Sequence, residues 1–347
     1  MRQPNSIPQT SETPSTEKAI PWHALTKARF IRAGDAAGLR YYLDEIAHEL
    51  ACKHRRYVWI IVGDNRKVLP VLAERFPEKF GGGVTSPPYF GLRDNGCGEK
   101  QIGLGKFADY VDDLDIVNGH VRTLLKPDAS FWEQIGDKSA GGGNGPRGET
   151  SSLGKQKPSQ EVENKFEKLP EGFKRRESLD LPGLCRASGR RCGFWNPATI
   201  VWDKGKPAAR SCKTCLPPSS ERIVWLTKSD QWYLNRLRLL RLFPHCAGDV
   251  WRFPPNRNQA ARAYHIDHSS TFPPELATAC LAVSTRPHDW VIDPFGGLGN
   301  TALGALPLNL NTLLIEQNPE YACCAAHIFQ SLPASLRPHL TILLTNL

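Results

Sequence analysis

The sequence lacks the marks of a membrane protein or an exported one. Its 347 residues contain no apolar run of the roughly 18 residues that a membrane-spanning helix needs, so we expect no membrane partner. The N-terminal stretch MRQPNSIPQTSETPSTEK is polar and has no apolar core of the kind that signal peptides carry. We therefore expect residues 1–23 to form a disordered tail and the protein to be cytoplasmic.

A disulfide framework and a complete zinc motif are also missing. The ten cysteines belong to a long chain without an export signal, which favours reduced thiols. The pair Cys212-x2-Cys215 has no second CxxC partner, and Cys185 and Cys192 upstream have a spacing that matches no common zinc ribbon or finger. Zinc is thus the weaker alternative to free thiols, and we predict no metal ligand.

Acidic residues are outnumbered. Lys and Arg total 44 against 35 Asp and Glu, which gives a net charge of +9 and suits a polyanionic partner. The excess is concentrated in residues 181–262, which hold 15 Lys and Arg against 4 Asp and Glu, together with five of the nine tryptophans. Basic residues interleaved with aromatics are typical of nucleic-acid contact. The alternative is a solvated rim above a tryptophan-rich core.

The apolar pattern predicts alternating strands and helices. Strands are expected at 57–62, up to Thr85, and at 130–136, 198–203, 222–227, 289–293, 312–316 and 340–344. Helices are expected at 24–55, 67–75, 108–125, 273–284, after Gly299 and at 319–331. This order predicts an α/β fold with a doubly wound, mostly parallel sheet. Residues 137–180, with GGGNGPRG, look like an exposed insertion, and 228–262 look irregular.

The stretch VIDPFGGLGNT, residues 291–301, places a glycine-rich loop between a strand ending at Asp293 and a helix. Glycines let the backbone approach a ligand closely. Glu316 ends the next strand, where an acid binds a nucleotide ribose in sheets of this kind. An adenosine-containing cofactor is therefore expected. The glycine spacing departs from the dinucleotide GxGxxG, which disfavours a nicotinamide oxidoreductase.

The stretch TSPPY, residues 85–89, is the second informative motif. Two successive prolines remove two amide donors and leave carbonyls as free acceptors. Alone, such a stretch is common in loops and polyproline ligands. Followed by the glycine loop near the C-terminus, it resembles the β group of amino-methylating DNA methyltransferases, in which a (D/N/S)PP(Y/F) motif precedes an FxGxG loop. The resemblance implies a Rossmann-like sheet of the seven-stranded methyltransferase type, with permuted motif order.

The resemblance also implies a cofactor and a set of site residues. The cofactor is S-adenosyl-L-methionine. The catalytic residues are Ser86, Pro87, Pro88 and Tyr89: the Ser86 hydroxyl and the Pro87 carbonyl accept from the amino group of a flipped base, and Tyr89 stacks on its ring. The cofactor-binding residues are Asp64, Phe272, Pro273, Asp293, Phe295, Gly296, Gly297, Gly299, Asn300, Thr301 and Glu316.

Composition, charge and the resemblance together divide the chain into segments. Residues 24–136 form a catalytic half, 137–180 a variable insertion for target recognition, 181–262 a basic segment that contributes strands and contacts DNA, and 263–347 a cofactor-binding half. The expected partner is double-stranded DNA, and a cognate restriction endonuclease is a second candidate partner. The expected source is a bacterium or a phage.

Serine at the first motif position usually accompanies the N4 amino group of cytosine in this family. We therefore expect a sequence-specific cytosine-N4 DNA methyltransferase. An N6-adenine enzyme is the alternative within the class. A catalytically silent DNA-binding relative is the alternative outside it, because Leu298, Pro307 and residues 213–224 depart from the family pattern.

Overall fold

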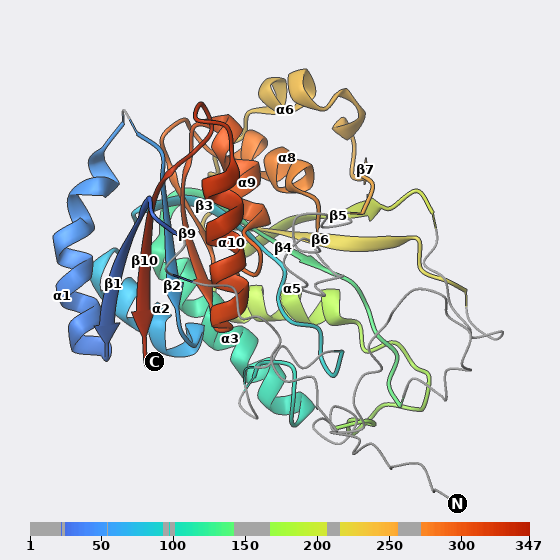
Figure 1. Cartoon of the computed structure of the whole chain (residues 1–347). Coiled ribbons are helices and arrows are strands. Elements are labelled where there is room, and N and C mark those ends of the chain that lie inside the picture. The colour runs from blue at the N-terminus through green and yellow to red at the C-terminus, as the bar shows by residue number, and fades with distance from the viewer. Residues whose placement is uncertain are drawn as a thin grey trace, which may run out of the picture.

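The computed structural model of the protein describes residues 22, 25–53, 55–92, 97, 101–141, 167–206, 216–255 and 272–347. Within these ranges the strands are β1 Ala28–Gly34, β2 Tyr57–Val62, β3 Phe80–Thr85, β4 Leu125–Ile135, β5 Trp195–Asp203, β6 Ser220–Thr227, β7 Val250–Arg252, β8 Trp290–Asp293, β9 Asn311–Glu316 and β10 His339–Thr345. They form one sheet in the order β1-β10-β2-β9-β8-β3-β4-β6-β5-β7 (Figure 1).

Most of this sheet is parallel. Neighbouring strands from β1 through β4 in the sheet order all run parallel. Strand β6 is antiparallel to both β4 and β5, and β7 is parallel to β5. This confirms the predicted α/β, doubly wound Rossmann-like sheet, with β6, β5 and β7 added beyond its seven parallel strands.

Helices cover both faces of the sheet (Figure 1). On one face lie α1 Ala36–Ile46, α2 Asn65–Arg75, α3 Phe107–Leu124 and α5 Leu181–Arg191. On the other lie α6 Arg236–Leu242, α8 Pro274–Ser284, α9 Asn300–Ala305 and α10 Pro319–Ser331. Short 3-10 turns occupy Ala47–Ala51 (η2), Pro244–Cys246 (η3) and Leu306–Leu308 (η4).

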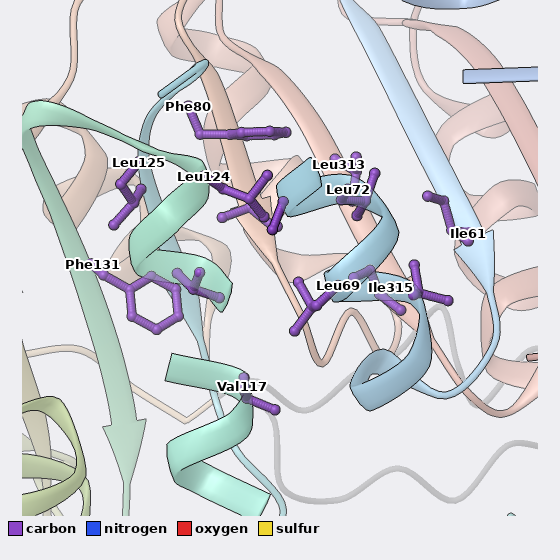
Figure 2. Close-up of a cluster of buried hydrophobic side chains, with 14 of the residues drawn as sticks. Ile61, Leu69, Leu72, Phe80, Val117, Leu124, Leu125, Phe131, Leu313 and Ile315 are labelled. Atoms are coloured by element: carbon purple, nitrogen blue, oxygen red, sulfur yellow. The ribbon is translucent and has the colours of Figure 1, made fainter. Parts of the chain in front are cut away.

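Strand β2 shows why helices are needed on both sides. Its six residues, YVWIIV, are all buried. Trp59 and Ile61 pack into the core beneath α1, α2 and α3, while Val58 and Ile60 pack into the core beneath α9 and α10. A parallel strand apolar on both faces is stable only when both faces are covered. Figure 2 shows leucines of α2 and α3 meeting residues of four strands in the first core.

Several sequence expectations are confirmed and some are wrong. The strands predicted at 57–62, 198–203, 222–227, 289–293, 312–316 and 340–344 are present, as are the helices near 67–75, 108–125, 273–284 and 319–331. The helix expected over 24–55 is wrong in its first part, because 28–34 pair with β10 as a parallel edge strand. Strand β4 begins at Leu125 rather than near residue 130. The sequence pattern does not predict helix α5, and 228–262 contain α6 and β7.

Three adjacent strands place the two sequence motifs together. Strands β9, β8 and β3 are neighbours and parallel, so Glu316, Asp293 and Thr85 at their carboxyl ends meet at one edge of the sheet. In open α/β sheets, ligands bind outside the carboxyl ends of the strands. The topology thus puts the glycine loop and the TSPPY loop side by side.

The described parts of the basic segment 181–262 lie at both ends of the strands rather than at one. Helix α6 is held at the opposite edge of the sheet, where Arg238 donates to the carbonyls of Thr285 and Leu308 before β8 and β9 begin. In Figure 1 α6 lies at the top, whereas the chain end that follows β10 lies at the bottom. The ends of β5 and β7, with Lys204 and Arg252, lie at the carboxyl edge with the two motifs.

Candidate active site

A pocket opens at the carboxyl edge of the sheet, and both motifs line it. Ser86, Pro87, Pro88 and Tyr89 form one part of the wall. Asp293, Phe295, Gly296, Gly297, Asn300 and Glu316 form another, and Phe272 closes it. Thus all four predicted catalytic residues and seven of the eleven predicted cofactor residues face one cavity.

Asp293 joins the two motifs. One carboxylate oxygen accepts from the Thr85 hydroxyl at 2.6 Å and from the Phe295 amide at 3.0 Å. The other accepts from the Thr301 hydroxyl at 2.6 Å. Burial of the carboxyl, which is 2% exposed, raises the pKa of Asp293 to about 6. Because Thr85 directly precedes Ser86, these bonds fix the TSPPY loop relative to the glycine loop.

The glycine loop needs glycine for conformation and for space. Gly297 and Gly299 have φ of +50° and +81°, in the left-handed region that side chains disfavour. A Cβ on Gly299 would also lie 2.4 Å from Cζ of Phe329 on α10. Gly299 and Thr301 do not line the pocket. Gly299 packs against Phe329, and the Thr301 hydroxyl donates to Asp293, which does line it.

Glu316 is held rigidly at the pocket wall. Its two oxygens accept from the backbone amides of Gly297 and Asn318, both at 2.7 Å. Burial raises the pKa of Glu316 to about 7. Each carboxylate oxygen has a second lone pair and can accept a further hydrogen bond. An acid fixed in this way beside a bare glycine loop fits the ribose of an adenosine-containing cofactor.

Phe272 and Asn300 connect the methionyl side of the predicted cofactor site to the loop. The Asn300 side chain donates to the Phe272 carbonyl at 2.9 Å, and both residues are buried. Pro273 is the residue that precedes α8, next to the lining residue Phe272. The structure therefore brings the block around Phe272, distant in sequence from the glycine loop, next to that loop.

Asp64 lies beside the pocket rather than in its wall. Its carboxylate caps α2 at the Arg66 amide and pairs with the Arg66 guanidinium at 2.7 Å. The neighbours Gly63 and Asn65 line the pocket instead, and the Asn65 side chain donates to the Pro294 carbonyl at 2.8 Å. A cofactor contact by Asp64 stays a prediction, and Asn65 is an additional candidate that the VGDN block contains.

Tyr89 is anchored by residues that sequence reasoning missed. Its hydroxyl donates to Glu221 at 3.1 Å and accepts from the Gln134 side chain at 3.1 Å. Burial raises the pKa of the Tyr89 phenol well above its ordinary value. The only sequence signal for Glu221 and Gln134 is a polar residue near one end of a strand, which does not reveal its partner.

Metal and membrane features are absent from the described ranges. Cys212 and Cys215 lie outside the described residues, whereas Cys185 is buried and Cys192 partly buried as free thiols. Within the residues that the structure describes, no three His, Cys, Asp or Glu side chains gather as a metal site. No helix among them has the length and apolarity to cross a membrane.

Comparison with known sequences finds type II methyltransferases among the similar proteins. The chain is 31% identical over 248 residues to the type II methyltransferase M.XycI of Xanthomonas campestris pv. cyanopsidis, covering 71% of this chain and 80% of that one. It is 30% identical over 270 residues to the type II methyltransferase M.SmaI of Serratia marcescens, covering 77% of this chain and 88% of that one.

Solved structures share the fold. A candidate DNA modification methylase of Thermus thermophilus, solved with S-adenosyl-L-methionine, superposes with a TM-score of 0.55 at 24% identity over 84% of this chain and 99% of that one. The PvuII DNA methyltransferase, described as cytosine-N4-specific, gives a TM-score of 0.57 at 20% identity over 81% and 90%. The DNA methylase family model matches residues 83–327, more than half of the chain and nearly all of the pocket wall. The chain therefore belongs to the N6/N4 DNA methylase family.

Proposed function

We propose that this DNA methyltransferase transfers a methyl group to the N4 amino nitrogen of cytosine in double-stranded DNA, at a specific sequence. The observation that carries the proposal is the single pocket shared by the TSPPY loop and the glycine loop, with Asp293 bonded to both. A pocket of this kind can hold a methyl donor and an acceptor next to each other.

The cofactor is S-adenosyl-L-methionine, which supplies an activated methyl group when bound. Glu316 would accept from the ribose hydroxyls, and the backbone at Gly296 and Gly297 would border the sulfonium-bearing chain. Phe272 would cover the methionyl end. These roles account for the two glycines at the positions where the loop backbone would border the cofactor.

The acceptor side needs two hydrogen-bond acceptors and a stacking surface. An exocyclic amino nitrogen is a poor nucleophile because its lone pair is delocalised into the ring. The Ser86 hydroxyl and the Pro87 carbonyl would accept from its two N–H groups and hold the lone pair toward the methyl. Tyr89 would stack on the ring, which must first be flipped out of the duplex. Orientation then supplies most of the rate enhancement.

Two observations favour cytosine over adenine. Serine, rather than aspartate or asparagine, precedes the two prolines. A protein of the same fold, the PvuII methyltransferase, is cytosine-N4-specific. The type II methyltransferases among the relatives support sequence-specific action, a bacterial or phage cytoplasmic setting and an accompanying restriction endonuclease.

A nucleoside assay tests the proposal directly. The protein is incubated with methyl-labelled S-adenosylmethionine and mixed-sequence duplex DNA, and the DNA is digested to nucleosides. We expect label in N4-methyldeoxycytidine. Label in N6-methyldeoxyadenosine would establish the adenine alternative. Cofactor and DNA binding without label would establish a catalytically silent relative.

A further inference from the structure

The Tyr89 hydroxyl is part of a polar cluster that the proposed chemistry does not use. Glu221 accepts from it at 3.1 Å, and Gln134 donates both to the hydroxyl at 3.1 Å and to the same Glu221 oxygen at 2.5 Å. The other Glu221 oxygen pairs with the Lys204 ammonium. We call these residues, Gln134, Lys204 and Glu221, the tyrosine anchor.

The anchor is built from three neighbouring strands outside the TSPPY loop. Gln134 is the last residue but one of β4, Glu221 is the second of β6, and Lys204 directly follows β5. Strand pairing sets Gln134 opposite Ile223 and Glu221 opposite Trp202, which brings all three to the carboxyl edge. At Gly136 a Cβ would lie 2.9 Å from Cγ of Glu221, so the glycine leaves room for the side chain.

The contacts restrain the tyrosine ring from its far end. Gln134 is 1% exposed, and Glu221 is largely buried, with an 18% exposed side chain. A hydrogen bond to a carboxylate is stronger than one between neutral groups, especially away from water. The ring lines the pocket while its hydroxyl is tied at the opposite end. Ring tilt is thereby set before any base arrives.

We propose that Glu221 is a positioning residue for methyl transfer, which holds the Tyr89 ring at the angle needed to stack on the flipped base. The proposal rests on the proposed function, because it assigns a role at the same site. Gln134 and Lys204 complete the positioning: Gln134 bridges hydroxyl and carboxylate, and Lys204 neutralises the buried charge. The base itself contacts the ring, not the anchor.

The test combines Tyr89→Phe, Glu221→Ala and the double variant. Tyr89→Phe keeps the stacking ring and removes only the tethered hydroxyl. We expect each single variant to lower the single-turnover methylation rate about 10- to 100-fold, in keeping with the loss of one hydrogen bond to a charged group. The double variant should be no slower than the slower single variant, because both substitutions remove the same interaction. Glu221→Gln, which keeps an acceptor oxygen, should restore part of the rate.

Three further measurements separate positioning from general stability. The affinity for S-adenosylmethionine should be unchanged in all variants, because the anchor does not touch the cofactor wall. Fluorescence of 2-aminopurine at the target position should show a flipped base that is less well stacked. Glu74→Gln, which removes the α2 carboxylate that pairs with Arg40 at the surface, is the matched control and should behave as wild type.

The outcomes distinguish this inference from the function on which it rests. Wild-type protein that binds cofactor and DNA but methylates nothing would refute the proposed function and the positioning role with it. An active wild type whose rate is unchanged in Tyr89→Phe and Glu221→Ala would refute the positioning role alone. Strictly additive losses, or losses matched by weaker cofactor binding, would also refute it.

Discussion

Ser86 and Glu316 line different parts of the same pocket. Ser86 is half buried at the start of the TSPPY loop, directly after Thr85, whose hydroxyl is bound by Asp293. Glu316 lies across the same pocket, with both oxygens held by backbone amides. Substitutions at the two residues should therefore affect different steps.

We predict that Ser86→Ala lowers the methyl-transfer rate and leaves cofactor affinity nearly unchanged. The hydroxyl should accept from the target amino group most strongly as the methyl moves, and loss of one such oriented group typically costs a factor of about 10²–10³. Single-turnover methylation and calorimetric cofactor binding measure the two effects. A fully active variant would remove Ser86 from the mechanism.

Glu316 should make cofactor binding depend on pH. Burial raises the pKa of Glu316 to about 7. In the proposed binding mode the ribose hydroxyls would donate to the ionised carboxylate. Affinity should therefore fall as the pH is lowered from about 8.5 to about 6.5, through the folded-state pKa. Glu316→Gln should bind more weakly by about 1–3 kcal/mol and show a flatter profile. Titration of the ligand itself is common to both proteins, so the difference between the two calorimetric profiles isolates Glu316.

Among the elements, strands β3 and β8 end in the two residues whose hydrogen bond connects the TSPPY loop to the glycine loop. Thr85 ends β3 and Asp293 ends β8, and their 2.6 Å bond spans two adjacent strands. Strand β4 contains a different buried acid, Glu133, which is 2% exposed and has one carboxyl oxygen without a hydrogen-bond partner in the described structure. Each feature gives a prediction about stability.

Thr85→Val should destabilise the fold by about 1–3 kcal/mol, because a buried carboxylate oxygen loses a donor. It should also lower the methylation rate, since the TSPPY loop loses its attachment to the glycine loop. Urea unfolding measures the first effect. Thr123→Val in α3, whose hydroxyl donates only to the Gly119 carbonyl one turn earlier, is the control and should cost less.

Glu133 should make the protein less stable at alkaline pH. Burial raises its pKa from 4.5 to about 8, so the folded state favours the protonated form. The stability that this provides is complete below the unfolded-state pKa and is lost as the pH rises through about 8, at about 1.4 kcal/mol for each unit of pKa difference. Glu133→Gln should flatten urea-unfolding stability between about pH 6 and about pH 9. An unchanged slope would mean that Glu133 is ionised in the folded protein.

At the scale of the whole molecule, charge is divided between two edges of the sheet. Arg236 and Arg241 belong to α6, at the edge away from the pocket, and Arg238 there is engaged with backbone carbonyls. Lys206 and Arg252 follow or end β5 and β7 at the pocket edge and are exposed. If a flipped base enters the pocket, its duplex must pass close to the pocket edge, where Lys206 and Arg252 lie.

We therefore predict that Lys206→Ala with Arg252→Ala weakens DNA binding and flattens its salt dependence. The slope of log affinity against log salt changes by about 0.9 for each phosphate that the protein no longer neutralises. Arg236→Ala with Arg241→Ala is the matched control and should leave slope and affinity unchanged. A larger effect of the α6 pair, measured by fluorescence anisotropy at several salt concentrations, would place the DNA on the other edge.

The sequence by itself determined the fold class, the two motifs and half of the residues that line the pocket. Strands such as β2 are apolar throughout, and the glycine loop and TSPPY carry local backbone requirements that do not depend on distant residues. Such local signals can be recognised in the sequence without knowledge of the fold.

Tertiary structure decided what depends on contacts between distant segments. The stretch 28–34 becomes a strand only because β10, at the other end of the chain, provides a parallel edge. Glu221 reaches Tyr89 across 132 positions, and Asp293 reaches Thr85 across 208. A charged residue in a strand or after it looks the same in sequence whether it faces water or an aromatic ring at a pocket wall. Its partner is set by sheet order and register, which arise only when the whole chain has packed.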